Sequence, residues 1–308
     1  MTRNAARLLI PIVATASGAK ILHAQGDPSQ VPVKVTRVSG GVYMLEGAGG
    51  NIGLSVGSDD AFMVDDQLAP LTAKIKAAIA TVTPRPVRFL LNTHWHPDHT
   101  GGNENMAGGG AIILAHENVR RRLSTEQFIA ALDAKIPASP RGALPVLTFP
   151  DSITLFLNDD SVRAVHVRRA HTDGDVLVYF QKANVVHMGD TFFNGGYPLV
   201  DLSSGGSIRG TIAAVDRALA TTNAQTRFIP GHGPLGNRAE LVTYRNVLKT
   251  IADRVARMVA QNRSLKEVLA AKPSAEYDAS WGKAFVNPDQ FVTAVYSSLT
   301  ASGRKPGR

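Results

Sequence analysis

A short histidine-rich segment constrains this chain more than any other feature of its sequence. The segment NTHWHPDHTGG directly follows an apolar run at residues 87–91. It contains three histidines and one aspartate, which are His94, His96, Asp98 and His99. Imidazole and carboxylate groups are the ligands that zinc uses where cysteine is absent. In an extended turn, the two alternating histidines can face one metal, and the aspartate and the last histidine can serve a second metal beside it. The two glycines at its end allow the backbone to turn tightly next to such a site.

The composition excludes several other kinds of site. The chain of 308 residues contains no cysteine, which removes disulfides, iron–sulfur clusters, cysteine-bound zinc and thiol nucleophiles. With 44% hydrophobic and 19% charged residues, it has the composition of a globular protein of one or two domains. The formal net charge of +8 is compatible with anionic small-molecule substrates. There is no basic run interleaved with aromatic residues, so we expect no nucleic-acid partner.

The N-terminus has the pattern of a secretory signal peptide. Arg3 and Arg7 precede an apolar run at residues 8–16, and small residues follow it. The run is shorter than the roughly 20 residues that a membrane-spanning helix needs. We therefore expect a signal peptide at residues 1–24, no membrane anchor, and a periplasmic or secreted protein. The competing interpretation is a disordered or helical N-terminal extension.

The apolar patterning predicts an α/β protein with two similar halves. Strands are predicted at residues 42–45, 51–56, 61–64, 87–91, 111–115, 153–157, 162–167, 176–180, 185–188 and 227–229. Helices are predicted at 71–80, 208–220 and 239–259, with polar helices from there to about residue 299. Another helix carries Arg120, Arg121 and Arg122 on a face that we expect to be solvated. The strand-rich halves are compatible with two packed sheets and helices outside them.

Four further segments complete a pattern with the histidine-rich one. They are Val64-Asp65, AHTDGD with His171, MGDTFF with Asp190, and PGHGP with His232. In this order, over residues 40 to 235, the segments resemble the motifs of the metallo-β-lactamase superfamily. The resemblance implies seven metal ligands. Those of the first metal are His94, His96 and His171, those of the second are Asp98, His99 and His232, and Asp190 binds the second metal or bridges both.

The resemblance also implies a fold and a division of the chain. The fold is α/β, a four-layer αββα sandwich of two mixed β-sheets flanked by helices. The hydrolase domain covers residues 31–238, and residues 239–308 form a helical extension packed on the same domain. Asp65 supports the metal site from behind the ligands.

The activity implied by the resemblance is that of an exported zinc-dependent hydrolase with two zinc ions per chain. Two adjacent dications lower the pKa of bound water to about 7, so that hydroxide attacks an acyl carbon at neutral pH. Asp98 is placed to orient the hydroxide and then to pass on a proton. The substrate is a small molecule with an amide, lactam, ester or lactone bond, and β-lactamase-like activity is included. The oligomeric state is not predicted.

Two positions depart from the zinc β-lactamases and leave further activities open. Asp190 stands where those enzymes have a cysteine ligand, and Phe193 stands where they have a lysine that holds a substrate carboxylate. Asp190-Thr191 is more similar to the glyoxalase II branch, whose thioesterases bind glutathione with basic residues of a C-terminal helical region. Candidates for that role here are Arg245, Lys249 and Arg254.

The same ligand set also suits proteins that do not hydrolyse an acyl bond. An iron-dependent sulfur dioxygenase is one of them, because iron accepts His and Asp ligands as well. A non-catalytic metal-binding partner protein is another. A nuclease is disfavoured, since the sequence has an export signal and lacks a basic groove.

The loops around the motifs give weaker predictions. The glycine-rich loop at residues 47–51 could flex over the metals, as the corresponding hairpin does in the lactamases. The segment at residues 192–198 forms either an apolar wall of the site or an ordinary packed loop, and Asn194 and Tyr197 are hydrogen-bonding candidates in it.

The histidines and aspartates outside the ligand set have structural interpretations. We expect His116 to cap or pack near the start of a helix. His166 and His187 pack or support the site from behind the ligands. Asp173 and Asp175 fix the turn that follows the histidine of the second motif.

Overall fold

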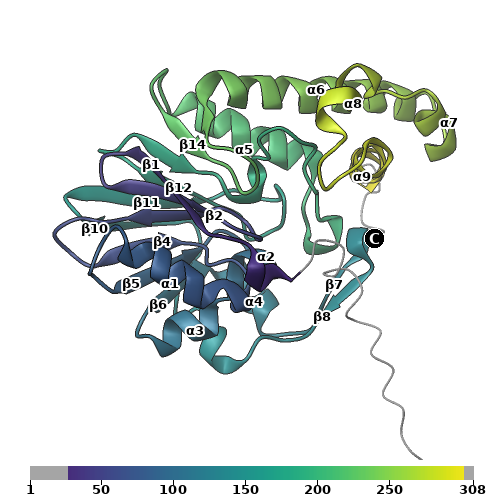
Figure 1. Ribbon diagram of the computed structural model, residues 1–308. Coiled ribbons are helices and arrows are strands. Elements are labelled where there is room, and N and C mark those ends of the chain that lie inside the picture. Colours follow the sequence, from purple (N-terminus) through teal and green to yellow (C-terminus); the bar gives the residue numbers. More distant parts are fainter. Residues whose placement is uncertain (1–26, 302–308) are drawn as a thin grey trace, which may run out of the picture.

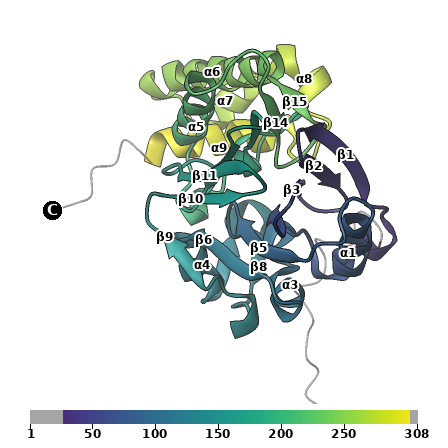
Figure 2. The ribbon, with the colours of Figure 1, turned by 90° about the vertical axis from the view of Figure 1, so that its left-hand side faces the viewer.

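Two β-sheets lie face to face, and helices cover the outer face of each sheet (Figure 1 and Figure 2). The computed structural model describes residues 27–301, so the predicted signal peptide at residues 1–24 lies outside the described residues. Among the described residues, no helix is long and apolar enough to cross a membrane.

The first sheet comes from the N-terminal half and mixes both kinds of strand pairing. In spatial order its strands are β1 (Lys34–Ser39), β2 (Val42–Glu46), β3 (Ile52–Ser55), β4 (Ala61–Val64), β5 (Val87–Asn92), β6 (Ile112–His116) and β9 (Leu147–Phe149). The first four strands pair antiparallel, and β4, β5, β6 and β9 pair parallel. A separate hairpin of β7 (Gln127–Ile129) and β8 (Ala134–Ile136) follows β6 and was not predicted from the sequence.

The second sheet comes from the C-terminal half. In spatial order it contains β10 (Ser152–Leu157), β11 (Asp160–His166), β12 (Val176–Phe180), β13 (Val185–His187), β14 (Arg227–Ile229) and β15 (Gly236–Asn237). Only β13 and β14 pair parallel; the other neighbours are antiparallel. Helix α5 (Ile208–Ala220) lies between these two strands in sequence, as a parallel connection requires.

Alternating side chains divide the strand residues between three apolar layers. Val178 and Phe180 of β12 point between the sheets and meet Phe62 and Val64 of β4. Tyr179, which lies between Val178 and Phe180 in the strand, points to the opposite face of the sheet and packs against the C-terminal helices. All five residues of β12 are buried because both faces of its sheet are covered.

The outer helices complete the four layers. Their bounds are α1 (Thr72–Ala80), α2 (Pro97–Thr100), α3 (Asn103–Gly108), α4 (Glu117–Leu123), α6 (Arg238–Ala260), α7 (Leu265–Ala270), α8 (Ala275–Trp281) and α9 (Pro288–Ala301). Helices α1 and α3 pack on the first sheet, while α5, α6 and α9 pack on the second. The predicted αββα sandwich of two mixed sheets is confirmed.

The helices after residue 239 contribute to the core of the second half. Helix α6 begins with a capping box in which Asn237 and Glu240 satisfy each other's backbone N–H groups. It buries Tyr244 and Leu248 against the second sheet. The expectation that the later helices are polar is wrong for α9, whose side chain of Phe291 is fully buried in the same core.

His116 and His166, which were both expected to have structural roles, contact each other where the two halves of the molecule meet. His116 caps α4 by accepting a hydrogen bond from the Asn118 N–H through Nδ1, as expected, and its Nε2 donates to the Pro150 carbonyl at 2.8 Å. His166 of β11 stacks on this ring at 3.7 Å between centroids and donates to the Asp175 carbonyl at 3.0 Å. The pair therefore joins the end of β6 to the end of β11.

One arginine that was expected on a solvated face is partly buried instead. Arg122 of α4 binds both carboxylate oxygens of Asp173, at 2.7 and 2.9 Å. A bidentate pair of this kind fixes both side chains, and it ties α4 to the turn after His171. Arg121 is exposed as expected.

The stacked histidines predict a loss of stability in acid. Burial lowers the pKa of both His116 and His166, and the neighbouring ring lowers that of His166 further. Because the pKa values in the folded state lie below the unfolded value of about 6.5, the neutral pair stabilises the protein above that pH. This contribution is lost as the pH falls through the lowered values. Residues Glu117, Arg121, Asp151, Arg168 and Asp173 carry the other charges around the pair.

We expect His166→Phe, which keeps a ring against His116, to weaken this dependence. Chemical denaturation at pH 7 and pH 5 should give a smaller loss of unfolding free energy for the variant than for the unmodified protein. An equal loss in both proteins would show that the pair does not respond to acid.

Candidate metal centre

The predicted ligands lie on loops that leave one edge of the two sheets. His94 and His96 follow the end of β5, and Asp98 and His99 lie in the one-turn helix α2. The other three follow strands of the second sheet: His171 after β11, Asp190 after β13 and His232 after β14. Sequence segments about 140 residues apart thus meet because parallel strands end at the same edge of a sheet. All seven predicted side chains are brought together, in two groups.

The first group consists of His94, His96, His171 and Asp190, whose candidate ligand atoms all lie within 4.8 Å of one another. His96 Nδ1 lies 2.9 Å from His171 Nε2. Asp190 Oδ2 lies 3.5 Å from His171 Nε2 and 3.9 Å from His94 Nε2. All four side chains are buried.

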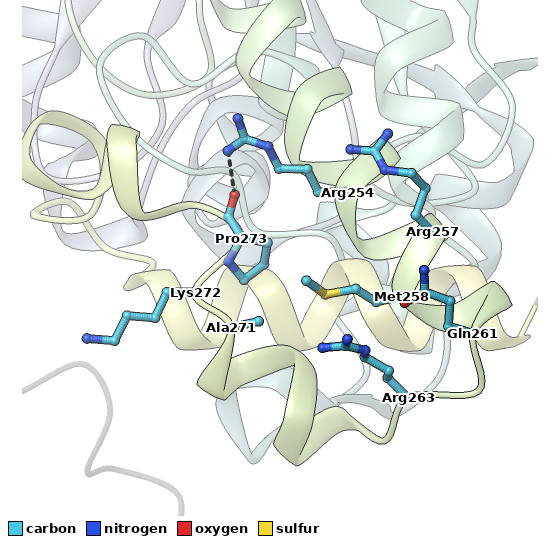
Figure 3. Close-up of a pocket in the computed structure, with 8 residues that line it drawn as sticks. All are labelled: Arg254, Arg257, Met258, Gln261, Arg263, Ala271, Lys272 and Pro273. Carbon is cyan, nitrogen blue, oxygen red and sulfur yellow. Dashed lines mark hydrogen bonds between the residues drawn. The ribbon is translucent and has the colours of Figure 1, made fainter.

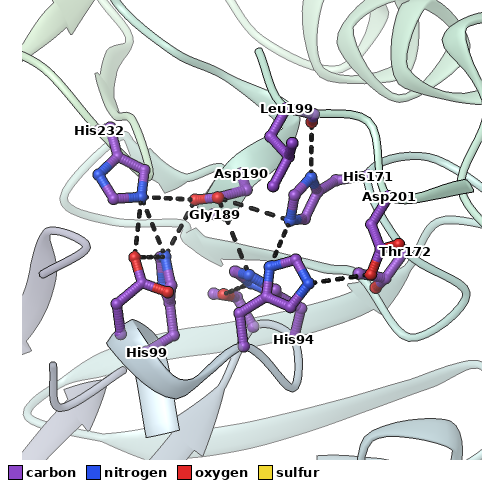
Figure 4. A network of polar contacts seen from close by, with 12 residues as sticks. His94, His99, His171, Thr172, Gly189, Asp190, Leu199, Asp201 and His232 are labelled. Carbon is purple, nitrogen blue, oxygen red and sulfur yellow. Dashed lines mark hydrogen bonds and ion pairs between the residues drawn. The ribbon is translucent and has the colours of Figure 1, made fainter. Parts of the chain in front are cut away.

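The second group consists of Asp98, His99 and His232, which meet the same distance limit. His232 Nε2 lies 3.2 Å from Asp98 Oδ2 and 3.4 Å from His99 Nε2. Asp190 reaches this group too, because its Oδ1 lies 3.0 Å from His99 Nε2 and 3.5 Å from His232 Nε2. The two oxygens of Asp190 therefore face different groups (Figure 4).

Contacts behind the second group fix the orientation of its buried histidine. Asp65 Oδ2 accepts from His99 Nδ1 at 2.8 Å, and the same carboxylate accepts from the backbone N–H and the hydroxyl of Thr93, both at 2.7 Å. His99 therefore directs Nε2 toward the cluster. The Thr93 hydroxyl also lies 3.0 Å from His94 Nδ1, so one carboxylate organises both groups.

Contacts behind the first group do the same for its other two histidines. Asp201 Oδ2 lies 3.1 Å from His96 Nε2, and the Leu199 carbonyl accepts from His171 Nδ1 at 2.8 Å. Asp201 itself accepts from the hydroxyl groups of Ser203 and Ser204. Metal-binding histidines regularly pair their other ring nitrogen with such an acceptor.

Sequence reasoning missed several of these supports. Asp201, Leu199 and Thr93 were not singled out, although Asp65 was. Asp201 lies in the loop between β13 and α5, eleven positions after Asp190, and no motif marks it. Thr93 could have been predicted as a support of the site, because its hydroxyl group directly precedes the first histidine of the histidine-rich segment.

The protonation states fit a metal site. Burial lowers the pKa of His94 and His171, which leaves neutral imidazoles. His94 Nε2 is buried and has no hydrogen-bond partner among the described atoms. Such an atom is costly unless something binds it, and a neutral imidazole nitrogen is a good ligand for a divalent cation.

The carboxylates of the second group favour positive charge on its two histidines. Burial would lower the pKa of His232, but the Asp190 and Asp98 carboxylates outweigh it and raise the pKa to about 9. The pKa of His99 is also raised, since Asp190, Asp98 and Asp65 outweigh the effect of burial. A divalent cation would replace these protons as the partner of the carboxylates. The donor set, five histidines and two carboxylates of which one is shared, therefore fits a metal centre.

Only one side of the cluster reaches solvent. The side chains of Asp98 and His232 are 36% and 33% exposed, while that of Asp190 is 4% exposed. A substrate can therefore approach past Asp98 and His232 but not from the side of the first group.

The glycine-rich loop at residues 47–51 is packed onto the site. Gly50 donates to the Asp98 carbonyl at 3.0 Å, and Asn51 donates to the Gly231 carbonyl at 2.7 Å. A Cβ at Gly50 would lie 2.0 Å from the His99 ring, so only glycine allows this approach. In this conformation the C-terminal end of the loop is hydrogen-bonded to the segments that carry the ligands, so the loop is not a free flap above the metal centre.

The segment after Asp190 is mostly packed, but one side chain borders the site. Phe193 stacks on His232 at 5.0 Å between ring centroids. Tyr197 is fully buried and donates to Asp278, while Asn194 donates to the Pro234 carbonyl. Both hydrogen-bonding candidates are therefore used inside the protein.

The three basic residues of α6 considered for glutathione binding all have acidic partners. Arg245 pairs with Asp216, Lys249 with Asp253, and Arg254 with Glu276, at 3.3, 2.8 and 2.6 Å. Each of the three positive charges is therefore balanced by an acidic side chain of the same protein.

Comparisons with known proteins agree with the fold and the motifs. The family description "Metallo-beta-lactamase superfamily" matches residues 46–242. Two hydroxyacylglutathione hydrolases are similar: that of Polaromonas sp. is 28% identical over 57% of this chain and 60% of its own length, and that of Nitrosococcus oceani is 30% identical over 48% and 49%. The alpha subunit of 2,4-dinitroanisole O-demethylase from Nocardioides sp. is 27% identical over 45% of this chain and 40% of its own length. The chain thus aligns with about two fifths to three fifths of the length of these relatives.

Among solved structures, a metallo-beta-lactamase from Pontibacter korlensis superimposes with a TM-score of 0.58 and 19% identity. The superposition covers 70% of this chain and 99% of that one. This likeness concerns the fold alone. The family match covers well over half of the sequence and includes all seven clustered side chains. The chain belongs to the metallo-beta-lactamase superfamily.

Proposed function

We propose that this protein is a hydrolase that holds two zinc ions in the two groups and cleaves an acyl bond of a small molecule. The observation that carries the proposal is the placement of Asp190 between the groups, with one oxygen toward each. In this proposal His94, His96 and His171 hold one ion, Asp98, His99 and His232 hold the other, and Asp190 is shared. The chemistry that bound zinc supplies is a lowered pKa of water, to about 7, and polarisation of a carbonyl oxygen.

The chain's own groups then orient water and move a proton. Asp98 is the one exposed carboxylate of the cluster, and the pKa of its carboxyl is low because the charges of His99 and His232 outweigh the effect of burial. It is therefore ionised and can accept a hydrogen bond from a water molecule, which orients that water. The proposed transfer of the water proton to Asp98 rests on its exposed position in the cluster and not on its pKa. Phe193 covers one face of His232 and excludes solvent there. Asp65 and Asp201 keep the histidine rings in place through the reaction.

The substrate class follows from the open side of the centre. The wall next to His232 is aromatic, because Phe193 stands where the lactamases have a lysine for a substrate carboxylate. We therefore propose amides, lactams, esters or lactones without a required carboxylate, with weak activity toward β-lactams.

Thioester hydrolysis is the second candidate function. It is favoured by the names of the similar hydroxyacylglutathione hydrolases. The ion pairs of Arg245 and Lys249 speak against glutathione binding by those two residues. Arg254 lies roughly 15 Å along α6 from Tyr244, which marks where that helix passes the metal centre, so it is too far away to hold a substrate there. A panel of nitrocefin, aryl esters, lactones and glutathione thioesters, assayed with added zinc, distinguishes the two.

Metal analysis separates the hydrolase from a dioxygenase and from a non-catalytic protein. We expect about two zinc ions per chain after loading. One iron per chain and oxygen consumption with persulfides would favour a dioxygenase. Two bound ions without turnover of any substrate in the panel would favour a non-catalytic metal-binding protein.

We also propose that the protein is exported. The support is the order of basic, apolar and small residues at positions 1–24, together with the absence of cysteine. Mass spectrometry of the mature N-terminus from a cell envelope fraction tests this, and an intact N-terminus in the cytoplasm would overturn it.

Asp65→Asn is expected to weaken metal binding. The amide keeps the shape of the side chain but cannot accept from both His99 and Thr93 with a full charge. Loss of such a support costs about 10- to 100-fold in metal affinity. Zinc competition with a coloured chelator measures the change.

Asp133→Asn is the matched control for this variant. Asp133 also has a left-handed backbone, with φ of 48° against 60° for Asp65, but it lies on the surface and away from the cluster. The proposed support role of Asp65 is wrong if both variants bind zinc as tightly as the unmodified protein.

Asp98→Asn is expected to lower kcat by about 100- to 10,000-fold on the best substrate of the panel, the range for loss of a general base. Zinc content is measured on the same sample. A variant that keeps its zinc and loses turnover supports the proton-transfer role, and a variant with full turnover would exclude it.

A further inference from the structure

A cavity lies in the C-terminal helices, outside the metal centre. It has a volume of about 380 Å³ and is bordered by the last turns of α6, the segment before α7, and the residues after α7. Its volume falls in the range of small-molecule sites, roughly 300–1,000 Å³. The residues that border it are Arg254, Arg257, Met258, Gln261, Arg263, Ala271, Lys272 and Pro273.

The cavity is too far from the metal centre to be part of it. Tyr244 of α6 packs on Phe192, two residues after Asp190, and marks where this helix passes the centre. Arg254 and Arg257 lie ten and thirteen positions further along the same helix. At 1.5 Å per residue they lie roughly 15–20 Å beyond Tyr244 along the axis.

The lining is strongly basic and contains no carboxylate. It carries four cationic side chains, three of which are arginines. Figure 3 shows Arg254 and Arg257 on one side of Met258 and Arg263 on the other. Like charges around one cavity repel one another, and a bound anion relieves the repulsion.

The arginines differ in how they are held. Arg254 is half-buried and fixed, because it donates to the Pro273 carbonyl at 2.8 Å and pairs with Glu276 outside the lining. The guanidinium groups of Arg257 and Arg263 have no ion pair or hydrogen bond to any residue between 27 and 301. Both side chains are exposed, and the charge of Arg263 also lowers the pKa of Glu267. The two guanidinium groups are therefore available, beside that of Arg254, for bidentate contacts with an anion.

We propose that this cavity binds a small anion that carries phosphate groups. Planar guanidinium forks match the oxygens of phosphate, and the arginines surround the cavity where several phosphate oxygens would lie. Met258, Ala271 and Pro273 supply an apolar surface for an organic part of such a ligand. Because the site lies apart from the metals, it does not depend on the proposed hydrolase activity.

Pyrophosphate is the probe, with inorganic phosphate and citrate as comparisons. Calorimetric titration of the zinc-loaded protein at 0.1 M salt should show pyrophosphate binding at one site in the lining, more tightly than phosphate or citrate. In Arg257→Ala/Arg263→Ala that affinity should fall at least tenfold. The pyrophosphate affinity of Arg257→Lys/Arg263→Lys should lie between those of the unmodified protein and the alanine variant. Lysine keeps the positive charge but lacks the planar guanidinium group that makes bidentate contacts.

The matched control is Arg85→Ala/Lys266→Ala, which removes the same charge from exposed positions outside the lining. Its affinity should equal that of the unmodified protein. Pyrophosphate that binds the metal centre does so equally in all four proteins and does not change the comparison. Thermal unfolding of each variant checks that the helices remain folded.

Three results would overturn the proposal. The first is equal pyrophosphate affinity in Arg257→Ala/Arg263→Ala and the unmodified protein, and the second is an equal loss of affinity in that variant and the control. The third is citrate binding that is as tight as that of pyrophosphate in the unmodified protein and is lost in Arg257→Ala/Arg263→Ala. The last would assign the cavity to carboxylates, and the second would reduce it to general surface charge.

Discussion

The structure depends on a shared carboxylate in a buried cluster of histidines. Asp190 is almost completely buried, and its pKa is low chiefly because the charged rings of His232 and His99 outweigh the effect of burial. A buried charge of this kind is tolerated only when it is paired, and removal of one partner of a buried pair costs about 3–5 kcal/mol. The carboxylate and the imidazoles therefore have to be brought together by the fold as one unit, and the loops that carry them cannot vary independently.

The packing of the two sheets provides that unit. The ligands of the second sheet approach those of the first because the apolar layer between the sheets fixes the position of β13 and β14 relative to β5. Glycines keep the loops close: a Cβ at Gly231 would lie 2.0 Å from Asp190 Oδ1, and one at Gly50 would meet the His99 ring. Small residues at these two positions matter as much as the ligands, since any larger side chain would separate the halves of the centre.

The metal ligands could be predicted because short sequence motifs identify them. Three histidines and an aspartate in one turn, and short glycine-bounded motifs after later strands, can be recognised without knowing the fold. Most strands of the two sheets were predictable for the same reason, since short apolar runs bounded by turn residues mark them; β9 and β15, of three and two residues, were not predicted. Asp201 was not, because its role depends on the Leu199–Ser204 loop returning to His96 from more than a hundred residues away. The β7–β8 hairpin was missed because its strands have only three residues each, and Arg122 because its partner Asp173 is distant in sequence.

The two groups of the cluster differ in their exposure to solvent, and this difference determines where a substrate can reach the site. The first group is closed: its histidines are buried and each is bonded from behind, so it can position an ion but cannot admit a large molecule. The second group contains both exposed side chains, Asp98 and His232, and the one acceptor free to exchange protons with solvent. A substrate must therefore meet the second group first, with Phe193 beside it. Phe193 stacks on His232 at this edge, so the ring next to the exposed histidine is aromatic and carries no positive charge, and the proposed substrate class depends on this difference from the lactamases.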